Sequence, residues 1–99
     1  MKAKLLLRRK VIYKNGTILE MVIWKLPNPD KERPHGLKYR LYYGLADGTC
    51  QVRYDNELGK GDHRHYCNKP EEFYLFTSVE TLIEDFLNDV SRYNKEEKS

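Results

Sequence analysis

The fold is decided by residues 37–55, which read LKYRLYYGLADGTCQVRYD. Apolar positions alternate with cationic or aromatic ones along the first half of this stretch. One face of the alternation carries Leu37, Tyr39, Leu41, Tyr43 and Leu45, and the other carries Lys38, Arg40 and Tyr42. A period of two is typical of a half-buried β-strand. Asp47-Gly48 then predicts a hairpin turn, and residues 49–55 continue as a second alternating strand with Arg53 on its outer face.

Another hairpin is predicted upstream. Residues 3–14 and 17–26 flank Asn15-Gly16, a dipeptide that suits the two positive-φ positions of a type I′ turn. Residues 17–26 are apolar on both faces, which predicts a central strand. Residues 3–14 carry a dense set of lysines and arginines, which predicts an open sheet edge that resists self-pairing.

The C-terminal third predicts a short strand over residues 73–76 and then a helix. Residues 77–80 read TSVE, a capping-box pattern, and apolar residues recur behind it at helical spacing. This stripe consists of Val79, Leu82, Ile83, Phe86, Leu87 and Val90, of which Leu82, Ile83, Phe86 and Leu87 should be buried. We therefore predict an α+β fold: an antiparallel, meander-like sheet of four to five strands, with one C-terminal amphipathic helix over residues 78–92 packed on one face.

Length and composition favour a small soluble protein. The 99 residues suffice for one core, so residues 1–99 are assigned to a single domain that ends in a flexible charged tail over 94–99. No apolar run is long enough for a signal peptide or a membrane span, and Cys50 and Cys67 match no redox or zinc-finger spacing. The expectation is a cytoplasmic protein with reduced thiols. The first 14 residues hold cations and no acid, which favours an anionic partner.

The groups best suited to chemistry lie in residues 54–65, which read YDNELGKGDHRH. In an extended backbone, His63 and His65 would point the same way and Arg64 the other. Histidine titrates near pH ~6.5, so one ring can be a base and the other an acid at neutral pH. Lys60 and Arg64 supply charge for a phosphate, which the glycine-flanked backbone can approach closely. These groups would support metal-independent RNA cleavage.

Two sets of site residues follow from this interpretation. The candidate catalytic residues are His63, His65, Lys60, Arg64 and Asp62. The candidate RNA-binding residues are Gly59, Gly61, Lys38, Arg40, Arg53 and Tyr42. No cofactor and no metal ion is expected. The third histidine, His35, lies between Pro34 and Gly36 and is interpreted as a turn residue.

Other interpretations of the same segment stay open. The GKGD run lacks the spacing and the Lys-Ser/Thr ending of a Walker A loop, which argues against nucleotide binding. His63, His65 and Cys67 alternate, so together with Asp62 or Asp55 they could hold a metal ion. The cationic sheet face could bind nucleic acid or a protein without cutting it. The segment could also be an ordinary solvated loop.

The pattern YDNxxGKGDHRH over residues 54–65, preceded by RPHGLKYR over residues 33–40, resembles the TumE-like toxin family of prokaryotic toxin–antitoxin modules. The similarity runs from the first hairpin through the C-terminal helix. It implies a growth-inhibiting toxin encoded beside a helix-turn-helix antitoxin, and it does not specify the reaction. An endoribonuclease is the activity inferred from the residues, and a homodimer stays open. We expect an acidic antitoxin segment to contact Lys60, Arg64 and the basic strand over 3–14.

Overall fold

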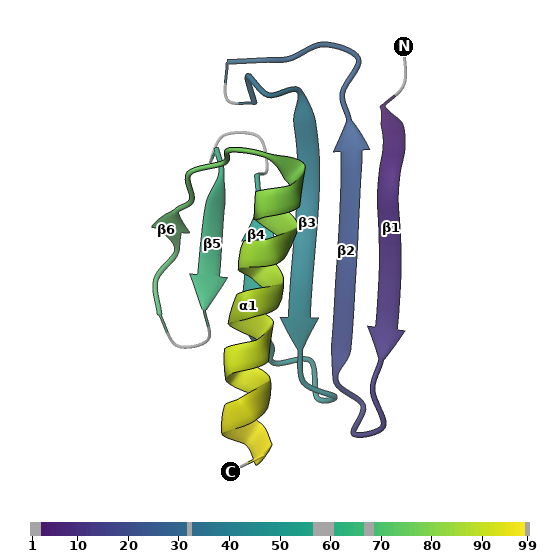
Figure 1. Cartoon of the computed structure of the whole chain (residues 1–99), viewed down its shortest axis with the longest axis vertical. Coiled ribbons are helices and arrows are strands. Elements are labelled where there is room, and N and C mark those ends of the chain that lie inside the picture. The colour runs from purple at the N-terminus through teal and green to yellow at the C-terminus, as the bar shows by residue number, and fades with distance from the viewer. Residues whose placement is uncertain (1–2, 32, 57–60, 67–68, 99) are drawn as a thin grey trace.

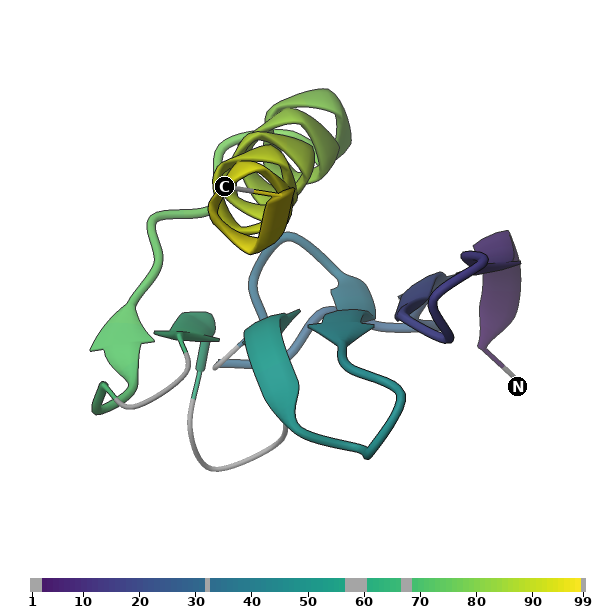
Figure 2. The ribbon, with the colours of Figure 1, turned by 90° about the horizontal axis from the view of Figure 1, so that it is seen from below.

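The computed structural model describes residues 3–31, 33–56, 61–66 and 69–98, with side chains up to residue 93. Within these residues, six strands form one antiparallel sheet and a single helix packs on one face (Figures 1 and 2). The elements are β1 Lys4–Ile12, β2 Ile18–Lys25, β3 Leu37–Gly44, β4 Cys50–Asp55, β5 His63–Tyr66, β6 Glu72–Phe73 and α1 Val79–Lys98. The predicted α+β meander is confirmed, with six strands instead of four to five.

The strands lie side by side in chain order, so every neighbour in the sheet is also a neighbour in sequence. β1 forms one edge, as its charge pattern predicts, and β2 lies inside the sheet between β1 and β3. The register aligns Leu19 with Tyr43, Tyr43 with Val52 and Val52 with Tyr66. Because side chains directly opposite each other share a face, this row runs across four strands as one apolar layer.

Both hairpin turns differ from the predicted two-residue form. The Gly16 N–H donates to the Tyr13 carbonyl at 2.9 Å, and Gly16 itself has a φ of 84°. Gly16 is thus the last residue of a four-residue turn that begins at Tyr13, and it forms the bulge of a three-residue loop. The Asn15 side chain accepts the Thr17 N–H at 3.0 Å, which fixes this geometry locally. The turn before Gly48 repeats the pattern, with the Asp47 side chain accepting the Thr49 N–H.

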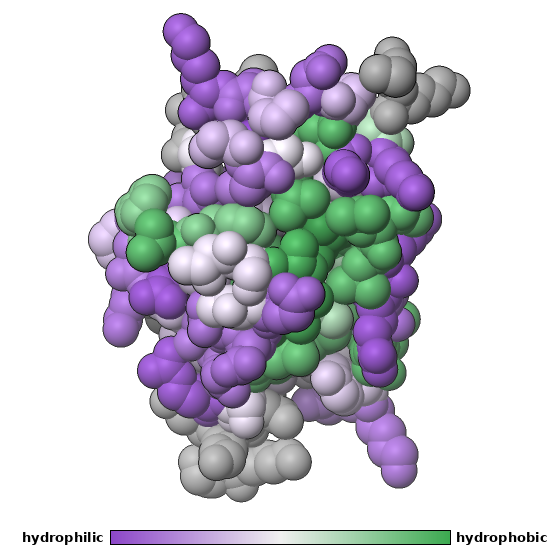
Figure 3. Space-filling model, turned by 45° about the horizontal axis from the view of Figure 1, so that its top comes forward, coloured by the Kyte–Doolittle hydropathy of each residue, from purple (hydrophilic) through white to green (hydrophobic). Residues whose placement is uncertain are grey.

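The core lies between the sheet and α1. It contains Tyr39, Leu41 and Tyr43 of β3, Val52 and Tyr54 of β4, and Leu82, Phe86 and Val90 of the helix. The prediction that Leu82 and Phe86 are buried is confirmed. The same prediction is wrong for Leu87, which is 40% exposed, and Ile83 is only half-buried. Figure 3 shows the hydrophobic surface that continues beside the helix, on the side of β1 and β2.

The ends of the helix also differ from the prediction. Ser78 is the N-cap: its Oγ accepts the Thr81 N–H at 3.1 Å and donates to Thr81 Oγ1 at 3.0 Å. The predicted cap placed Thr77 in that position. At the other end, α1 continues to Lys98, through most of the segment predicted to be a tail. In the described part of the chain, no helix is long and apolar enough to cross a membrane.

The helix covers only one face of the sheet, and we call the other one the open face (Figure 2). Alternation places on the open face those residues whose neighbours in the strand point to the helix. From β2 to β5, the open-face residues include Val22, Trp24, Lys38, Arg40, Tyr42, Arg53, Asp55, His63 and His65. Most of these are polar or aromatic, so the open face is not a second hydrophobic core.

Candidate functional site

β5 carries the two histidines to the open face. His63 lies opposite Asp55, Arg64 opposite Tyr54 and His65 opposite Arg53. The Tyr54 hydroxyl donates to Asp89 of α1, so Tyr54 and its cross-strand neighbour Arg64 face the helix. The predicted arrangement, with His63 and His65 on one face and Arg64 on the other, is confirmed.

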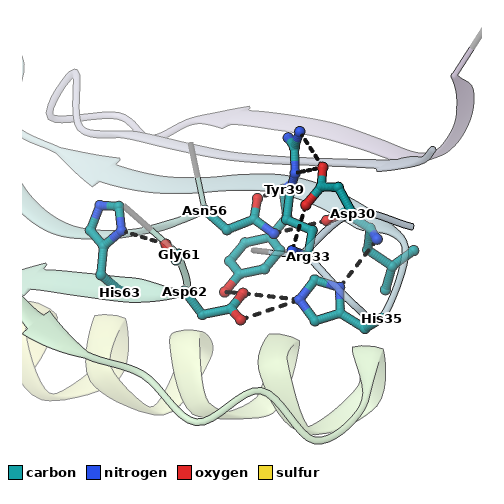
Figure 4. A network of polar contacts seen from close by, with 9 residues as sticks. Asp30, Arg33, His35, Tyr39, Asn56, Gly61, Asp62 and His63 are labelled. Carbon is teal, nitrogen blue, oxygen red and sulfur yellow. Dashed lines mark hydrogen bonds and ion pairs between the residues drawn. The ribbon is translucent and has the colours of Figure 1, made fainter. Parts of the chain in front are cut away.

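His63 is held on both sides of its ring. Its Nε2 lies 2.6 Å from Asp55 Oδ1, and each of these side chains is only 7% exposed. Its Nδ1 lies 3.0 Å from the Gly61 carbonyl oxygen (Figure 4). The contact with Asp55 is an ion pair without the alignment of a hydrogen bond. Because both nitrogens face acceptors, the imidazolium form satisfies both contacts, and a neutral ring satisfies only one.

Arg53 and Glu71 complete a small charge cluster around this pair. Arg53 Nε lies 3.2 Å from Asp55 Oδ2, and Arg53 Nη2 donates to Glu71 Oε1 at 3.0 Å. The same Glu71 oxygen lies 3.8 Å from His63 Nε2. Cations and carboxylates therefore alternate, and the negative charge of Asp55 is offset where it is buried. Glu71 carries no signal in the sequence, because it reaches the cluster from the loop that precedes β6.

His65 is the more accessible of the two histidines. Its side chain is half-buried, and its open-face neighbour across the strands is Arg53. Its Nδ1 is buried and has no hydrogen-bond partner among the described residues. A ligand cannot reach this buried nitrogen, so only the exposed part of the half-buried ring is open to one. His65 is therefore better placed than His63 to exchange a proton with a ligand.

Arg64 lies on the face of the sheet that the helix covers. Its Nε donates to Glu72 Oε1 at 2.5 Å, and its guanidinium lies 5.5 Å from the Tyr66 ring and 6.0 Å from the Tyr74 ring. It also donates to the Tyr54 hydroxyl at 3.5 Å. The structure thus does not bring this predicted phosphate contact together with His63 and His65. Lys60 and Gly59 of the predicted phosphate site lie outside the described residues. Gly61, its other glycine, is described, and its carbonyl oxygen contacts His63 Nδ1.

Asp62 belongs to a polar network that the sequence did not reveal (Figure 4). Its carboxylate accepts from the Tyr39 hydroxyl at 2.7 Å and from His35 Nε2 at 3.1 Å. His35 Nδ1 accepts the Leu37 N–H at 3.1 Å, so Nε2 carries the proton that points at Asp62. Burial, and then the hydrogen bond to Asp62, raise the pKa of Tyr39 well above its usual range. We call this network the Asp62 clasp.

His35 is a turn residue, as predicted: the Gly36 N–H donates to the Arg33 carbonyl at 2.9 Å and closes a turn around Pro34 and His35. Its side chain has a further structural role in the clasp. His35 is 14% exposed, lies 4.1 Å from Phe76 between ring centroids, and joins the loop before β3 to the start of β5. Asn56 adds to this junction, because its fully buried amide accepts the Tyr39 N–H and donates to the Leu37 carbonyl. Both residues lie in the two motifs that carry the family resemblance, which is the signal that sequence reasoning could have used.

A groove on the open face leads to the charge cluster. It has a volume of about 680 Å³ and is lined by Val22, Trp24, Arg33, Lys38, Tyr39, Arg40 and Asp55. Lys38 and Arg40, both predicted to bind RNA, line it directly, and Tyr42 lies beside it with its ring 5.4 Å from the Arg40 guanidinium. Asp55 is one of the lining residues, so the groove reaches the pair that Asp55 forms with His63.

The structure adds no support for the alternative metal site formed by His63, His65 and Cys67. Among the residues with described positions, no group of three or more His, Cys, Asp and Glu side chains could hold a metal ion. Cys67, the third ligand in that alternative, lies outside them.

Comparison with known proteins places this geometry in a family. The model of a family described as Toxin TumE matches residues 2–94. No curated protein and no solved structure matched the chain. The match includes all six strands, both histidines and the residues of the Asp62 clasp. The chain therefore belongs to the TumE family of toxins.

Proposed function

We propose that this toxin inhibits growth by cleaving RNA on the open face of its sheet, without a metal ion. The observation that supports the proposal is the position of His63 and His65 on that face, next to Arg53 and beside a cationic groove that Asp55 helps to line. RNA supplies its own nucleophile, the 2′-hydroxyl, so the protein needs only to move protons and stabilise negative charge.

His65 is the proposed general base. Its ring takes the proton from the 2′-oxygen, which attacks phosphorus, while Arg53 offsets the charge of the phosphate. The 5′-oxygen leaves with a proton from water or from Lys60, and the products are a 2′,3′-cyclic phosphate and a 5′-hydroxyl. His63 has its Nε2 buried against Asp55, so we assign to it the neutralisation of that carboxylate. Without this positive charge, Asp55 would repel the approaching phosphate.

The reaction can be tested on purified protein in the presence of EDTA. Structured RNA should yield fragments with 2′,3′-cyclic phosphate ends, and DNA of the same sequence should remain intact. The His65→Ala variant should cleave about 10²–10⁴-fold more slowly, which is the usual contribution of one proton transfer. Arg9→Ala, an exposed position outside the open face, is the control. Cleavage that survives in the His63→Ala, His65→Ala double variant would remove both histidines from the mechanism.

A second function is binding without cleavage. It is favoured by the fact that both nitrogens of His63 are occupied by contacts within the protein. In that case the open face would hold nucleic acid or a partner, with binding to nucleic acid that weakens steeply as salt increases and gives no product. The same incubation in EDTA distinguishes the two functions, since only the first one generates new RNA ends.

A toxin implies a protein that neutralises it. We propose that this antitoxin is a helix-turn-helix protein encoded in the neighbouring reading frame, and that both proteins act in the cytoplasm. A neighbouring gene of another kind would contradict this. Light scattering of the purified toxin would test the homodimer that the sequence leaves open.

A further inference from the structure

The groove on the open face has an aromatic floor. Trp24 lines it together with Val22, and Trp24 is the only tryptophan of the chain. The register places Leu5 of β1 opposite Trp24 on one side and Lys38 of β3 on the other. Trp24 is half-buried and Leu5 is 43% exposed, so an apolar surface reaches the solvent at this end of the groove.

Cations surround this aromatic floor. Arg33, Lys38 and Arg40 line the groove, and among the described residues that line it Asp55 is the one carboxylate. The carboxylate is offset by His63 at 2.6 Å and by Arg53 at 3.2 Å. Arg33 and Arg40 have acidic neighbours of their own, whereas the structure gives Lys38 no ion pair among the described residues. An anion that enters the groove therefore meets more positive than negative charge.

The combination of a tryptophan floor and flanking cations suits a single-stranded nucleic acid. Unpaired bases stack on aromatic side chains, and the backbone phosphates contact lysine and arginine. A base within a duplex has both faces covered by its neighbours and cannot stack on a protein side chain. The groove should therefore discriminate between single and double strands through Trp24.

The groove also has a defined relation to the histidines. Trp24 lies on β2 and His63 on β5, three strand spacings away and two residues further along the strands. With spacings of ~4.8 Å between strands and ~3.4 Å between residues, the two positions are roughly 16 Å apart. A short stretch of extended single strand covers this distance. A base at Trp24 therefore belongs to a different nucleotide from the two that the cleaved bond joins.

We infer that the groove is a subsite for single-stranded RNA, in which one unpaired base stacks on Trp24 while Lys38 and Arg40 contact the adjoining phosphates. The inference rests on the proposed function, because it names the form of RNA that the histidines would receive. It assigns to Trp24 the selection of a base at a distance from the site of cleavage.

The single tryptophan provides the test. A short 2′-O-methyl oligoadenylate cannot be cleaved by the proposed route, so its binding is measured separately from the reaction. This single strand should quench the tryptophan fluorescence saturably. The duplex of the same strand with its complement should cause no quenching. In a binding assay with a labelled strand, Trp24→Ala should weaken binding roughly 5- to 100-fold, whereas Trp24→Phe should retain most of it.

Two arginine variants separate the groove from general attraction. Arg40→Ala should weaken binding and reduce the slope of log K against log salt by about 0.7, the value for one phosphate contact on a single strand. Arg9→Ala removes the same charge from the helix side of β1 and should leave the quenching unchanged. Equal effects of both variants would overturn the inference.

The subsite and the reaction can fail independently. Quenching by the 2′-O-methyl strand without cleavage of ordinary RNA would support the subsite and contradict the proposed reaction. Cleavage without any quenching would contradict the subsite alone. Quenching by the duplex as strong as by the single strand would also overturn it, because it excludes stacking as the cause.

Discussion

Nε2 of His63 on β5 lies 2.6 Å from Oδ1 of Asp55 on β4, and 93% of each side chain is shielded from solvent. This pair ties the short strand that carries both histidines to the middle of the sheet. β5 has only four residues, and its other neighbour, β6, has two. The orientation of the open-face groups on β5 therefore depends on side-chain contacts to β4 as well as on the backbone ladder.

Asp55→Asn should destabilise the protein and reduce its toxicity. The substitution keeps the shape and removes the charge that faces His63 and Arg53. We expect a loss of about 1–3 kcal/mol, the cost of a buried polar group that is left without its partner. Urea unfolding measures the loss. A double-mutant cycle with His63→Gln should give a coupling energy above about 0.5 kcal/mol, and a value near zero would show that the pair contributes nothing.

The Asp62 clasp should matter for stability before it matters for binding. Asp62→Ala leaves the Tyr39 hydroxyl and His35 Nε2 without an acceptor, at about 1–3 kcal/mol for each unsatisfied group. Asp62→Asn keeps one acceptor oxygen and should cost less. Urea unfolding of both variants measures this difference. Quenching of Trp24 by the 2′-O-methyl strand should persist in both, since Asp62 faces the helix side. Equal stability of Asp62→Ala and the unchanged protein would contradict the clasp.

Two adjacent helix positions offer a matched test of the core. Phe86 is fully buried and packs edge-on against Tyr54, with ring centroids 5.6 Å apart, whereas Leu87 is 40% exposed. Phe86→Ala should cost about 3–5 kcal/mol, and Leu87→Ala less than about 1 kcal/mol. Urea unfolding gives both values. A loss below about 1 kcal/mol for Phe86→Ala would mean that the helix is not docked on the sheet.

The parts of the fold that were predicted from the sequence depend on local patterns. The alternation in residues 37–43 predicted which side chains of β3 are buried, because a strand imposes its period directly on neighbouring residues. The helix stripe predicted Phe86 for the same reason. It failed at Leu87, since the helix covers β4 more than β1 and β2, and this offset is a tertiary property.

The parts that were missed depend on contacts distant in sequence. β5 has no apolar alternation of its own, and its strand conformation arises from pairing with β4 and from Tyr66, whose hydroxyl donates to Asp89 of the helix at 2.7 Å. His35 and Asp62 are 27 residues apart, so the local sequence around either residue does not predict their contact. Alternation predicted correctly that Arg64 lies on the face opposite to His63 and His65. It could not predict which of the two faces of the sheet the helix covers.

Alkaline pH should destabilise the protein through its tyrosines. Burial, and then hydrogen bonds to carboxylates, raise the pKa of Tyr39, Tyr54 and Tyr74, and they raise the pKa of Tyr66 to about 12. An unfolded tyrosine releases its proton near pH ~10. Between pH ~10 and ~12 the native state binds more protons than the unfolded state, so the stability that these tyrosines contribute is fully present below this window and falls through it. The urea midpoint measured against pH tests this.

The Tyr66→Phe variant isolates one contribution to that fall. It lacks the titrating hydroxyl, and Asp89 keeps its hydrogen bonds from Tyr54 and Arg92. Its urea midpoint should fall less between pH ~10 and ~12 than that of the unchanged protein. A parallel fall in both proteins would show that Tyr66 does not titrate differently in the native state.

The open edge of β1 is the best place for an antitoxin to bind. One side of this strand has no partner among the described strands, and its side chains include Lys4, Arg8, Arg9 and Lys10. The expected antitoxin contact to Arg64 is less favourable, because that guanidinium is already engaged by Glu72 and lies over two aromatic rings. An acidic extended segment could instead add a seventh strand beside β1, where backbone hydrogen bonds supply affinity and charge supplies the association rate.

Charge reversal at this edge should slow formation of the complex. Arg8→Glu with Lys10→Glu places two acids where the antitoxin's acids would arrive, and association should become slower on the order of tenfold at low salt, with a smaller effect at moderate salt. Lys31→Glu with Lys69→Glu changes the net charge equally at two exposed positions outside β1. Surface binding of the toxin and its antitoxin gives both association rates. If the two double variants slow association equally, net charge alone steers the encounter, and the antitoxin binds somewhere other than the β1 edge.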